Sequence, residues 1–101
     1  MIEKLHQGDI LKIEQIKVPV LVVSKDFFND SGEIIGCPIV EDSSKGPLHI
    51  GISAGEIEGV VQCEKLAMLD LHVRGYKKLG SLQMIEKMNI SDAIQGIFDY
   101  I

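Results

Sequence analysis

The chain has 101 residues, of which 46% are hydrophobic, and this is enough for one hydrophobic core without metal or disulfide support. Its 15 acidic and 10 basic residues give a net charge of −5 at pH 7, which disfavours broad, electrostatically driven binding of nucleic acid. No apolar run approaches the roughly 18 to 20 residues of a membrane span, and the N-terminus lacks the apolar stretch of a secretory signal. We therefore expect a single cytoplasmic domain over residues 1–101, with no membrane contact.

Short segments rich in Val and Ile alternate with clusters of Gly, Pro, Asn, Asp and Ser, which predicts a mainly β domain of antiparallel strands. Val20–Val23 is apolar without alternation, so we expect this strand to lie centrally, covered on both faces, with Pro19 at its start. Turns are expected at Asp30–Gly32, Glu41–Pro47 and Ser53–Glu56. The predicted strands are Asp9–Gln15, Val20–Ser24, Glu33–Val40, Leu48–Ile52, Gly59–Leu66, Ala67–Leu71 and a short one near Lys77–Leu79.

From Ser81 onward the apolar spacing becomes that of a helix. Ser81 is a suitable N-cap, and Ser91-Asp92 indicates either a break near Asn89 or a second capped helix. We expect the apolar stripe to pack on the core, with any remainder available for a dimer interface. The stripe consists of Met84, Ile85, Met88, Ile94, Ile97, Phe98 and Ile101.

Two cysteines and three histidines are the candidate metal ligands. Cys37 and Cys63 lie in strand-like apolar runs without CxxC spacing, so we expect buried, reduced thiols rather than a disulfide or a reactive site. His6, His49 and His72 are far apart and lack metal-ligand spacing, and we expect no metal or cofactor. His49 alternates with Leu48 and Ile50 and should face solvent or a groove, where a structural role is favoured over that of a general base.

Polar side chains gather in the segment Val60–Gly75. Gln62, Glu64 and, further on, Asp70 and Arg74 lie in or beside two successive predicted strands. A carboxylate beside cations can act as a general base, and an arginine can stabilise developing phosphate charge. The alternative, which the spacing alone favours, is a solvated strand face with a salt bridge at a strand end.

Motifs spread over nearly the whole chain occur in the order of a known family. They are Gly8-Asp9, Pro19 with Ser24, Asn29, Pro38, Gly59 with Cys63, and Asp70 with Arg74-Gly75. In this order and spacing the chain resembles the MazF/PemK (Kid) family of toxin endoribonucleases. The resemblance implies a small SH3-like antiparallel β-barrel with a C-terminal helix, a fold shared with the gyrase poison CcdB. It also implies a homodimer whose RNA groove crosses the dimer interface.

Active members of that family cleave single-stranded RNA without a metal, with the 2′-hydroxyl as nucleophile. An antitoxin silences them by placing a disordered tail in the same groove. Cleavage of this kind requires a base for the 2′-hydroxyl proton, a cation for the charge on phosphorus, and a donor for the leaving 5′-oxygen.

This chain departs from the family pattern at the residues that carry the chemistry. Val18 replaces the arginine before the proline, and Val40 replaces the threonine or serine after the third strand. The long loop before Pro19 is reduced to Gln15–Val18. Gln62 stands where Kid-like members have arginine, whereas Glu64 keeps a carboxylate and Lys65 adds one positive charge.

These departures lead to a first hypothesis of a divergent MazF/PemK-like toxin–antitoxin protein with weakened or lost RNA cleavage, acting through protein binding. The alternative is a metal-independent endoribonuclease (mRNA interferase) with a rebuilt site, in which Glu64 is the base and Lys65, Lys17 or Arg74 supplies the cation. A third idea is CcdB-like poisoning of a protein target through the C-terminal helix. The expected groove for RNA or an antitoxin peptide contains Lys17, Glu41, His49 and Gln62.

Overall fold

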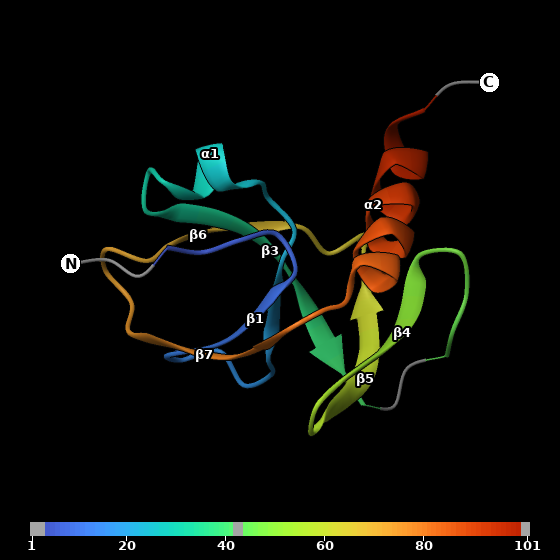
Figure 1. Ribbon diagram of the computed structural model, residues 1–101, viewed down its shortest axis with the longest axis horizontal. Coiled ribbons are helices and arrows are strands. Elements are labelled where there is room, and N and C mark those ends of the chain that lie inside the picture. Colours follow the sequence, from blue (N-terminus) through green and yellow to red (C-terminus); the bar gives the residue numbers. More distant parts are fainter. Residues whose placement is uncertain (1–3, 42–43, 100–101) are drawn as a thin grey trace.

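The computed structural model describes residues 4–41 and 44–99. Its strands form a curled, antiparallel half-barrel, and a C-terminal helix stands beside the β4–β5 hairpin (Figure 1). The strand order is β4-β5-β3-β2-β1-β7, and β6 pairs with the first half of β3. This arrangement confirms the expected mainly β fold with one C-terminal helix. The elements are β1 (Asp9–Ile13), β2 (Val20–Val22), α1 (Asp26–Asn29), β3 (Glu33–Val40), β4 (His49–Ala54), β5 (Ile57–Gln62), β6 (Ala67–Asp70), β7 (Tyr76–Ser81) and α2 (Met84–Phe98).

The turns account for the strand bounds that sequence analysis placed wrongly. β1 ends at Ile13 rather than Gln15, because Gln15 adopts a left-handed backbone with φ of 69° and the Ile16 N–H donates to the Ile13 carbonyl. The β4–β5 turn is only Gly55-Glu56, so β4 extends to Ala54 and β5 begins at Ile57, two residues earlier than expected. β3 matches its predicted range. The expected turn Glu41–Pro47 includes Asp42 and Ser43, which lie outside the described residues.

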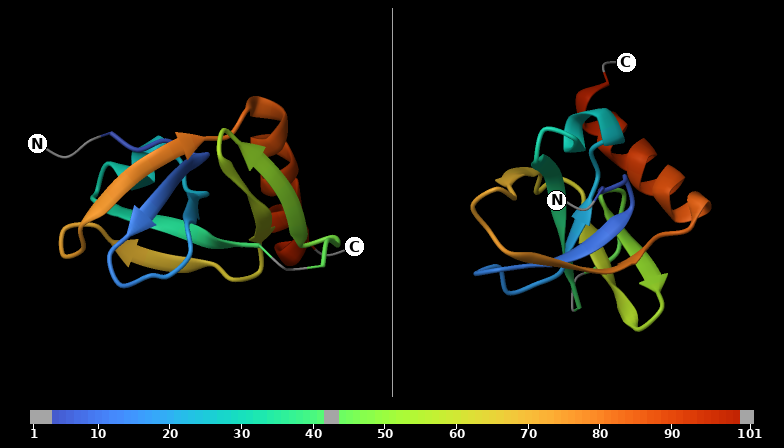
Figure 2. Two further views of the ribbon diagram at one scale, coloured as in Figure 1. Left: turned by 90° about the horizontal axis from the view of Figure 1, so that it is seen from below. Right: turned by 60° about the vertical axis from the view of Figure 1, so that its left-hand side comes forward.

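β2 joins two clusters of buried side chains, one on each of its faces. Leu21 belongs to the first cluster, which extends under β4, β5 and α2, whereas Val20 and Val22 belong to the second, which lies under β1 and β6. All three residues of β2 are buried, so the expectation of a central strand covered on both faces is confirmed. Figure 2 shows from two further directions that α2 lies beside the β4–β5 hairpin.

The two cysteines are free and buried in the first cluster, as expected. Burial raises the pKa of the Cys37 thiol to about 12 and that of Cys63 to about 11. Both therefore behave as small apolar side chains at neutral pH.

A buried polar network explains why the apolar run of β2 stops at Ser24. The Ser24 hydroxyl donates to the Asn29 side-chain oxygen and accepts the Ile35 N–H, while the Asn29 amide donates to the carbonyls of Ser24 and Leu5. Asn29 ends α1, a short helix that sequence analysis did not predict, and leaves Phe27 81% exposed. The network ties the N-terminal segment, α1 and β3 to the end of β2.

The C-terminal helix is one continuous element, so both expected alternatives, a break near Asn89 and a second helix at Ser91-Asp92, are wrong. Ser81 is not the N-cap, because it is the last residue of β7; Gln83 and Glu86 form a reciprocal capping box instead. The expectation that the apolar stripe packs on the core is also wrong for most of it, since Ile90 is the residue that the helix buries. The exposed members are Met84, Ile85, Met88, Ile97 and Phe98, and Ile101 lies outside the described residues.

No helix in the part of the chain that the structure describes is long and apolar enough to cross a membrane.

Candidate functional site

The two positions that the family resemblance associates with catalysis lie next to each other. β2 pairs with β3 through Val20 opposite Pro38, and the Ile39 N–H donates to the Pro19 carbonyl at 2.9 Å. Val18 and Val40 flank this hydrogen bond, each one residue beyond its partners. Both valines are partly exposed. These two positions therefore present methyl groups, which can neither carry a charge nor donate a proton.

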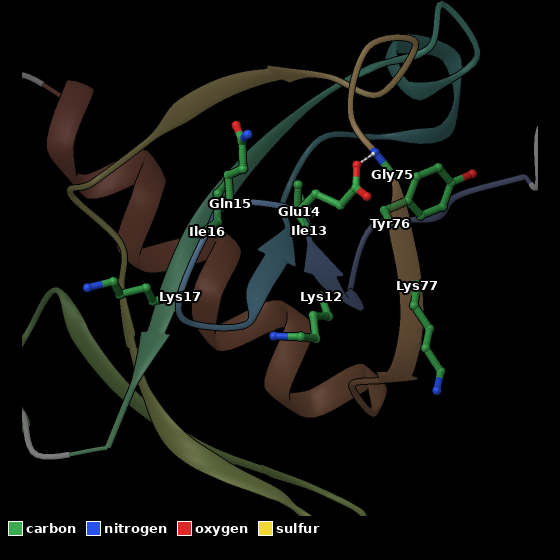
Figure 3. A pocket seen from close by; sticks show the side chains of 9 residues that line it. All are labelled: Lys12, Ile13, Glu14, Gln15, Ile16, Lys17, Gly75, Tyr76 and Lys77. Atoms are coloured by element: carbon green, nitrogen blue, oxygen red, sulfur yellow. Dashed lines mark hydrogen bonds between the residues drawn. The ribbon is translucent and has the colours of Figure 1, made fainter.

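The short β1–β2 connection borders a shallow hollow of about 600 Å³, which we call the basic hollow (Figure 3). Ile13, Ile16 and Tyr76 provide apolar side chains that pack on the second core cluster. The Glu14 carboxylate is turned toward β7 and accepts the Gly75 N–H at 2.7 Å. The whole lining is Lys12, Ile13, Glu14, Gln15, Ile16, Lys17, Gly75, Tyr76 and Lys77.

Two of the lysines in this hollow stand directly opposite each other. In the β1–β7 register Lys12 pairs with Lys77, so their Cβ atoms are about 5 Å apart on one face of the ladder. Like charges in this arrangement destabilise a sheet. Within residues 4–41 and 44–99, no carboxylate forms an ion pair with Lys12, Lys17 or Lys77. The repulsion is therefore not offset within the described chain.

A second hollow, of about 780 Å³, lies over β4, β5 and the start of α2, and we call it the acidic hollow. Its charged side chains are one lysine, Lys45, and four carboxylates: Glu41, Glu56, Glu58 and Glu86. Glu86 also holds the helix on the sheet, since its carboxylate accepts the Ser53 N–H at 2.9 Å.

A third hollow, of about 430 Å³, contains an imidazole–carboxylate pair and is lined by Ser44–His49 and Glu64. The His49 Nε2 lies 2.9 Å from the Glu64 Oε2, and the His49 Nδ1 lies 3.1 Å from the Ser44 carbonyl oxygen. The hydrogen bond to Glu64 raises the pKa of His49, and the same bond lowers the pKa of Glu64. Lys45 lines this hollow as well, and Lys65 follows Glu64 in the chain.

This pair is better suited to hold charge than to remove a proton. Both ring nitrogens of His49 face acceptor oxygens, which favours the imidazolium form. A carboxylate whose pKa is lowered is a weaker base than an ordinary one. The pair can therefore supply a cation or a general acid at His49 more readily than a general base at Glu64.

The structure brings some of the candidate residues together and separates others. Gln62 stands opposite His49 in the β4–β5 register, so these two and Glu64 share one end of the hairpin. Glu64 and Lys65 precede β6 in the chain and Arg74 follows it, so Arg74 is separated from the other two by the length of that strand. Lys17 lines the basic hollow and Glu41 the acidic one.

Sequence analysis missed several residues of these hollows. Lys12 and Lys77 are 65 positions apart, and only the β1–β7 register reveals that they face each other. The contact of Glu86 with Ser53 likewise could not be predicted from the sequence, because it depends on how α2 packs on β4. The polar position of Lys12 in an otherwise buried strand was the available signal.

Each histidine of the chain pairs with a carboxylate: His6 with Asp26, His49 with Glu64, and His72 with Asp70. Among the residues described by the structure, no group of three or more His, Cys, Asp or Glu side chains is arranged to hold a metal ion.

The family model described as "PemK-like, MazF-like toxin of type II toxin-antitoxin system" matches residues 7–98. The chain belongs to this family. The match spans β1 to the end of α2, and thus every strand that forms the three hollows. A search of curated proteins found no significant match.

Solved structures of MazF toxins share the fold. The chain is 18% identical to a chain of the MazE–MazF crystal structure from Deinococcus radiodurans, with a TM-score of 0.84 over 94% of this chain and 96% of that one. An endoribonuclease from a mycobacterial species gives 16% identity and a TM-score of 0.81, covering 93% and 90%. The Mycobacterium tuberculosis toxin MazF-mt6 gives 15% and 0.75, covering 93% and 98%. At these identities the comparison establishes the PemK/MazF-type fold.

Proposed function

We propose that this PemK/MazF-family protein has lost, or retains only weakly, the RNA cleavage of the family and acts by binding another protein. The observation that carries the proposal is the pair Val18 and Val40, which flank the hydrogen bond between Pro19 and Ile39 where the resemblance places a cation and a hydroxyl. Removing one such transition-state contact costs about a hundredfold in rate or more, and the two losses are not additive in general.

The charge distribution supports the same conclusion. The net charge is −5, and four carboxylates line the acidic hollow. A polyanion such as single-stranded RNA is repelled by such a surface. Protein partners do not require a broad positive field.

Cleavage of a long unstructured RNA by purified, nuclease-free protein tests the proposal. We expect no cleavage by the wild type above that of a preparation from cells without the gene. The double substitution V18R and V40T should introduce measurable cleavage, because it supplies the missing cation and hydroxyl. The matched control V18Q with V40A changes the same two partly exposed positions without supplying a cation or a hydroxyl, and should remain inactive. Cleavage by the wild type that disappears in Glu64→Gln would contradict the proposal.

The alternative function is a metal-independent endoribonuclease with a rebuilt site, and the hollow shared by Lys45, His49 and Glu64 favours it. His49 would donate a proton to the leaving 5′-oxygen, Lys45 or Lys65 would stabilise charge on phosphorus, and Glu64 would accept the 2′-hydroxyl proton. Because its pKa is lowered, Glu64 is a weak general base, so the endoribonuclease function is less favoured than the binding function. His49→Gln separates the two functions, because it abolishes cleavage in this scheme.

The partner that fits the family best is an antitoxin peptide bound to a homodimer in the cytoplasm. Two features support it: solved neighbours include an endoribonuclease in complex with its cognate antitoxin, and α2 leaves Met84, Ile85 and Met88 exposed. Apolar side chains in such a patch are typical of protein interfaces. Light scattering during size-exclusion chromatography should give twice the monomer mass, and Met88→Lys should reduce it toward the monomer. A monomeric wild type would remove the dimer from the proposal.

A further inference from the structure

We infer that a fourth hollow, beside α1, is a binding site for a free nucleotide. This hollow, which we call the α1 hollow, has a volume of about 510 Å³. The N-terminal segment, α1 and α2 all contribute to its lining, which consists of His6, Gln7, Lys25, Asp26, Phe27 and Lys87. A nucleotide site is a function beyond the proposed protein binding, and it involves neither Val18 nor Val40.

The wall formed by α1 carries an aromatic ring that the fold leaves in solvent. Phe27 is 81% exposed, whereas Asn29 is buried and donates to the carbonyls of Leu5 and Ser24. Because Asn29 anchors α1, the Phe27 ring is presented from a fixed element at the edge of the hollow. A planar base stacked on this ring would remove apolar surface from water, and stacking is available to every base because each has a π face.

Two lysines reach the hollow from different elements. Lys25 directly precedes α1, and Lys87 belongs to α2. The Lys87 side chain lies across Gly8, whose φ is 96° and where a Cβ would lie 2.5 Å from the Lys87 Cδ. Glycine at this position therefore leaves the space in which Lys87 extends along the N-terminal segment. In the part of the chain that the structure describes, neither lysine forms an ion pair, so both can offset the charge of a phosphate.

The remaining polar groups join the walls and supply one acceptor. The Gln7 amide donates to the Val23 carbonyl at 3.0 Å, and the His6 Nδ1 lies 2.8 Å from the Asp26 Oδ2. The Asp26 Oδ1 has no hydrogen-bond partner among residues 4–41 and 44–99. A carboxylate oxygen of this kind accepts hydrogen bonds from ribose hydroxyls.

These groups match one nucleotide better than a nucleic-acid strand or a simple anion. Single-stranded RNA is bound along a positive groove in which successive bases stack on several aromatic rings. The lining of the α1 hollow contains one ring and two lysines, and its volume is typical of a small-molecule site. Inorganic phosphate would leave the Phe27 ring in solvent. The hollow therefore has one partner each for a base, a sugar and a phosphate group.

Titration of the full chain, labelled with ¹⁵N, with adenosine 5′-monophosphate (AMP) tests the inference. We expect saturable shifts of the backbone amide signals of Gln7, Phe27 and Lys87. Ribose 5-phosphate, which lacks the base, and adenosine, which lacks the phosphate, should each bind about tenfold more weakly. No saturable shift with AMP, or equal binding of AMP and ribose 5-phosphate, would overturn the inference.

Variants of Phe27 test the stacking contact. Phe27→Ala should weaken the binding of AMP about tenfold, whereas Phe27→Tyr keeps an aromatic ring and should preserve it. Phe98→Ala is the matched control, because it removes another exposed ring, at the C-terminal end of α2, and should change the affinity less than twofold. Equal losses in Phe27→Ala and Phe98→Ala would overturn the inference.

Charge-neutralising variants test the phosphate contact. K25Q with K87Q should weaken the binding of AMP about tenfold and leave that of adenosine unchanged. K12Q with K77Q is the matched control, since it changes the net charge equally in the basic hollow and should change the affinity for AMP less than threefold. Equal losses in the two double variants would show that AMP responds only to net charge and would overturn the inference.

A fluorescein-labelled, unstructured RNA of 12 nucleotides gives the remaining outcome. RNA binding that is lost in Phe27→Ala, without binding of AMP, would overturn the inference in favour of a nucleic-acid surface. RNA cleavage by the wild type would contradict the proposed function but would not change the result with AMP. The two failures therefore give different results.

Discussion

The basic hollow and the acidic hollow lie at different ends of the same curled sheet and differ in how their charges are compensated. Three lysines line the basic hollow without an ion-pair partner in the described chain, whereas the acidic hollow holds four carboxylates and one lysine. The net charge of −5 is therefore an average over two surfaces of opposite sign. The four carboxylates disfavour RNA binding over the acidic surface, whereas the net charge says little about the other end.

The two hollows also lie over different cores. The second core cluster supports the basic hollow through Ile13, and the first supports the acidic hollow through Ile52. β2 contributes to both clusters, because its side chains alternate between the faces of the sheet. Because β2 belongs to both clusters, substitutions in this strand can show whether the two ends of the molecule unfold together or separately.

The largest effect is expected for Leu21→Ala and Val22→Ala, which truncate one strand toward opposite clusters. Leu21→Ala should lower the free energy of unfolding by about 2–5 kcal/mol, and Val22→Ala by about 2 kcal/mol, because each leaves a cavity. Urea denaturation followed by circular dichroism measures both. Hydrogen exchange is the control: if Leu21→Ala released only the amides around the first cluster, the two ends would be separate units.

The next effect concerns the thiols of the first cluster. Since burial raises the pKa of Cys37 to about 12 and of Cys63 to about 11, few thiolates form at pH 8. We expect both to react with Ellman's reagent at least about a hundredfold more slowly in the native protein than in urea. Rapid native reaction would indicate that the acidic end opens independently.

A smaller effect is expected at the contact between α2 and the acidic hollow. Glu86→Ala removes one half of the capping box and the acceptor of the Ser53 N–H, and should cost about 1 kcal/mol of stability. Thermal unfolding measures the loss. The matched control Glu58→Ala removes a carboxylate from the same hollow without a helix contact, and an equal loss in the control would argue against the capping role.

The smallest effect is the pH dependence of the His49–Glu64 pair. Because the pKa of His49 is raised, its contribution to stability is present below about pH 6.5 and is lost as pH rises through the folded pKa. Because the pKa of Glu64 is lowered, its contribution is present above about pH 4.5 and is lost as pH falls through the folded pKa. Both contributions are therefore complete between these values.

Titration of His49 by NMR checks this prediction. Glu64→Gln should return the pKa of His49 toward its ordinary value of 6.5, since the hydrogen bond to Glu64 is the main cause of the shift. Glu58→Gln, which changes a carboxylate outside the third hollow, is the matched control and should leave the titration of His49 as in the wild type. An unchanged His49 would mean that Glu64 is not its partner in solution.

The strands could be predicted from the sequence because their apolar runs are short and bounded by turn residues. β3 was predicted at its correct bounds for this reason. The family resemblance supplied the half-barrel topology, which composition does not encode. The errors occurred where tertiary contacts determine the structure. Ser81 has the side chain of an N-cap, but it pairs with Asp9 in the β1–β7 ladder. Met84 and Met88 have the spacing of a core stripe, but α2 leaves both exposed.

The candidate site was less predictable than the fold. The absence of charge at Val18 and Val40 could be read from the sequence once the resemblance was recognised. The partnership of His49 with Glu64 required the β4–β5 hairpin, and that of Lys12 with Lys77 required a long-range register. Sequence analysis predicted that Arg74 lies close to Glu64. In the structure β6 separates these two residues along the chain, which does not support that prediction.

The network around Ser24 and Asn29 has a consequence for the synthesis of the protein. All of its members, Leu5 and Ile35 included, lie within the first 35 residues of the chain. β1 and β2 pair within the same stretch, and β3 completes its pairing with β2 by residue 38. The N-terminal segment of a growing chain therefore contains every partner of this hydrogen-bond network before the ribosome has added β4, β5 or α2. It can fold first and provide the surface on which the later strands assemble.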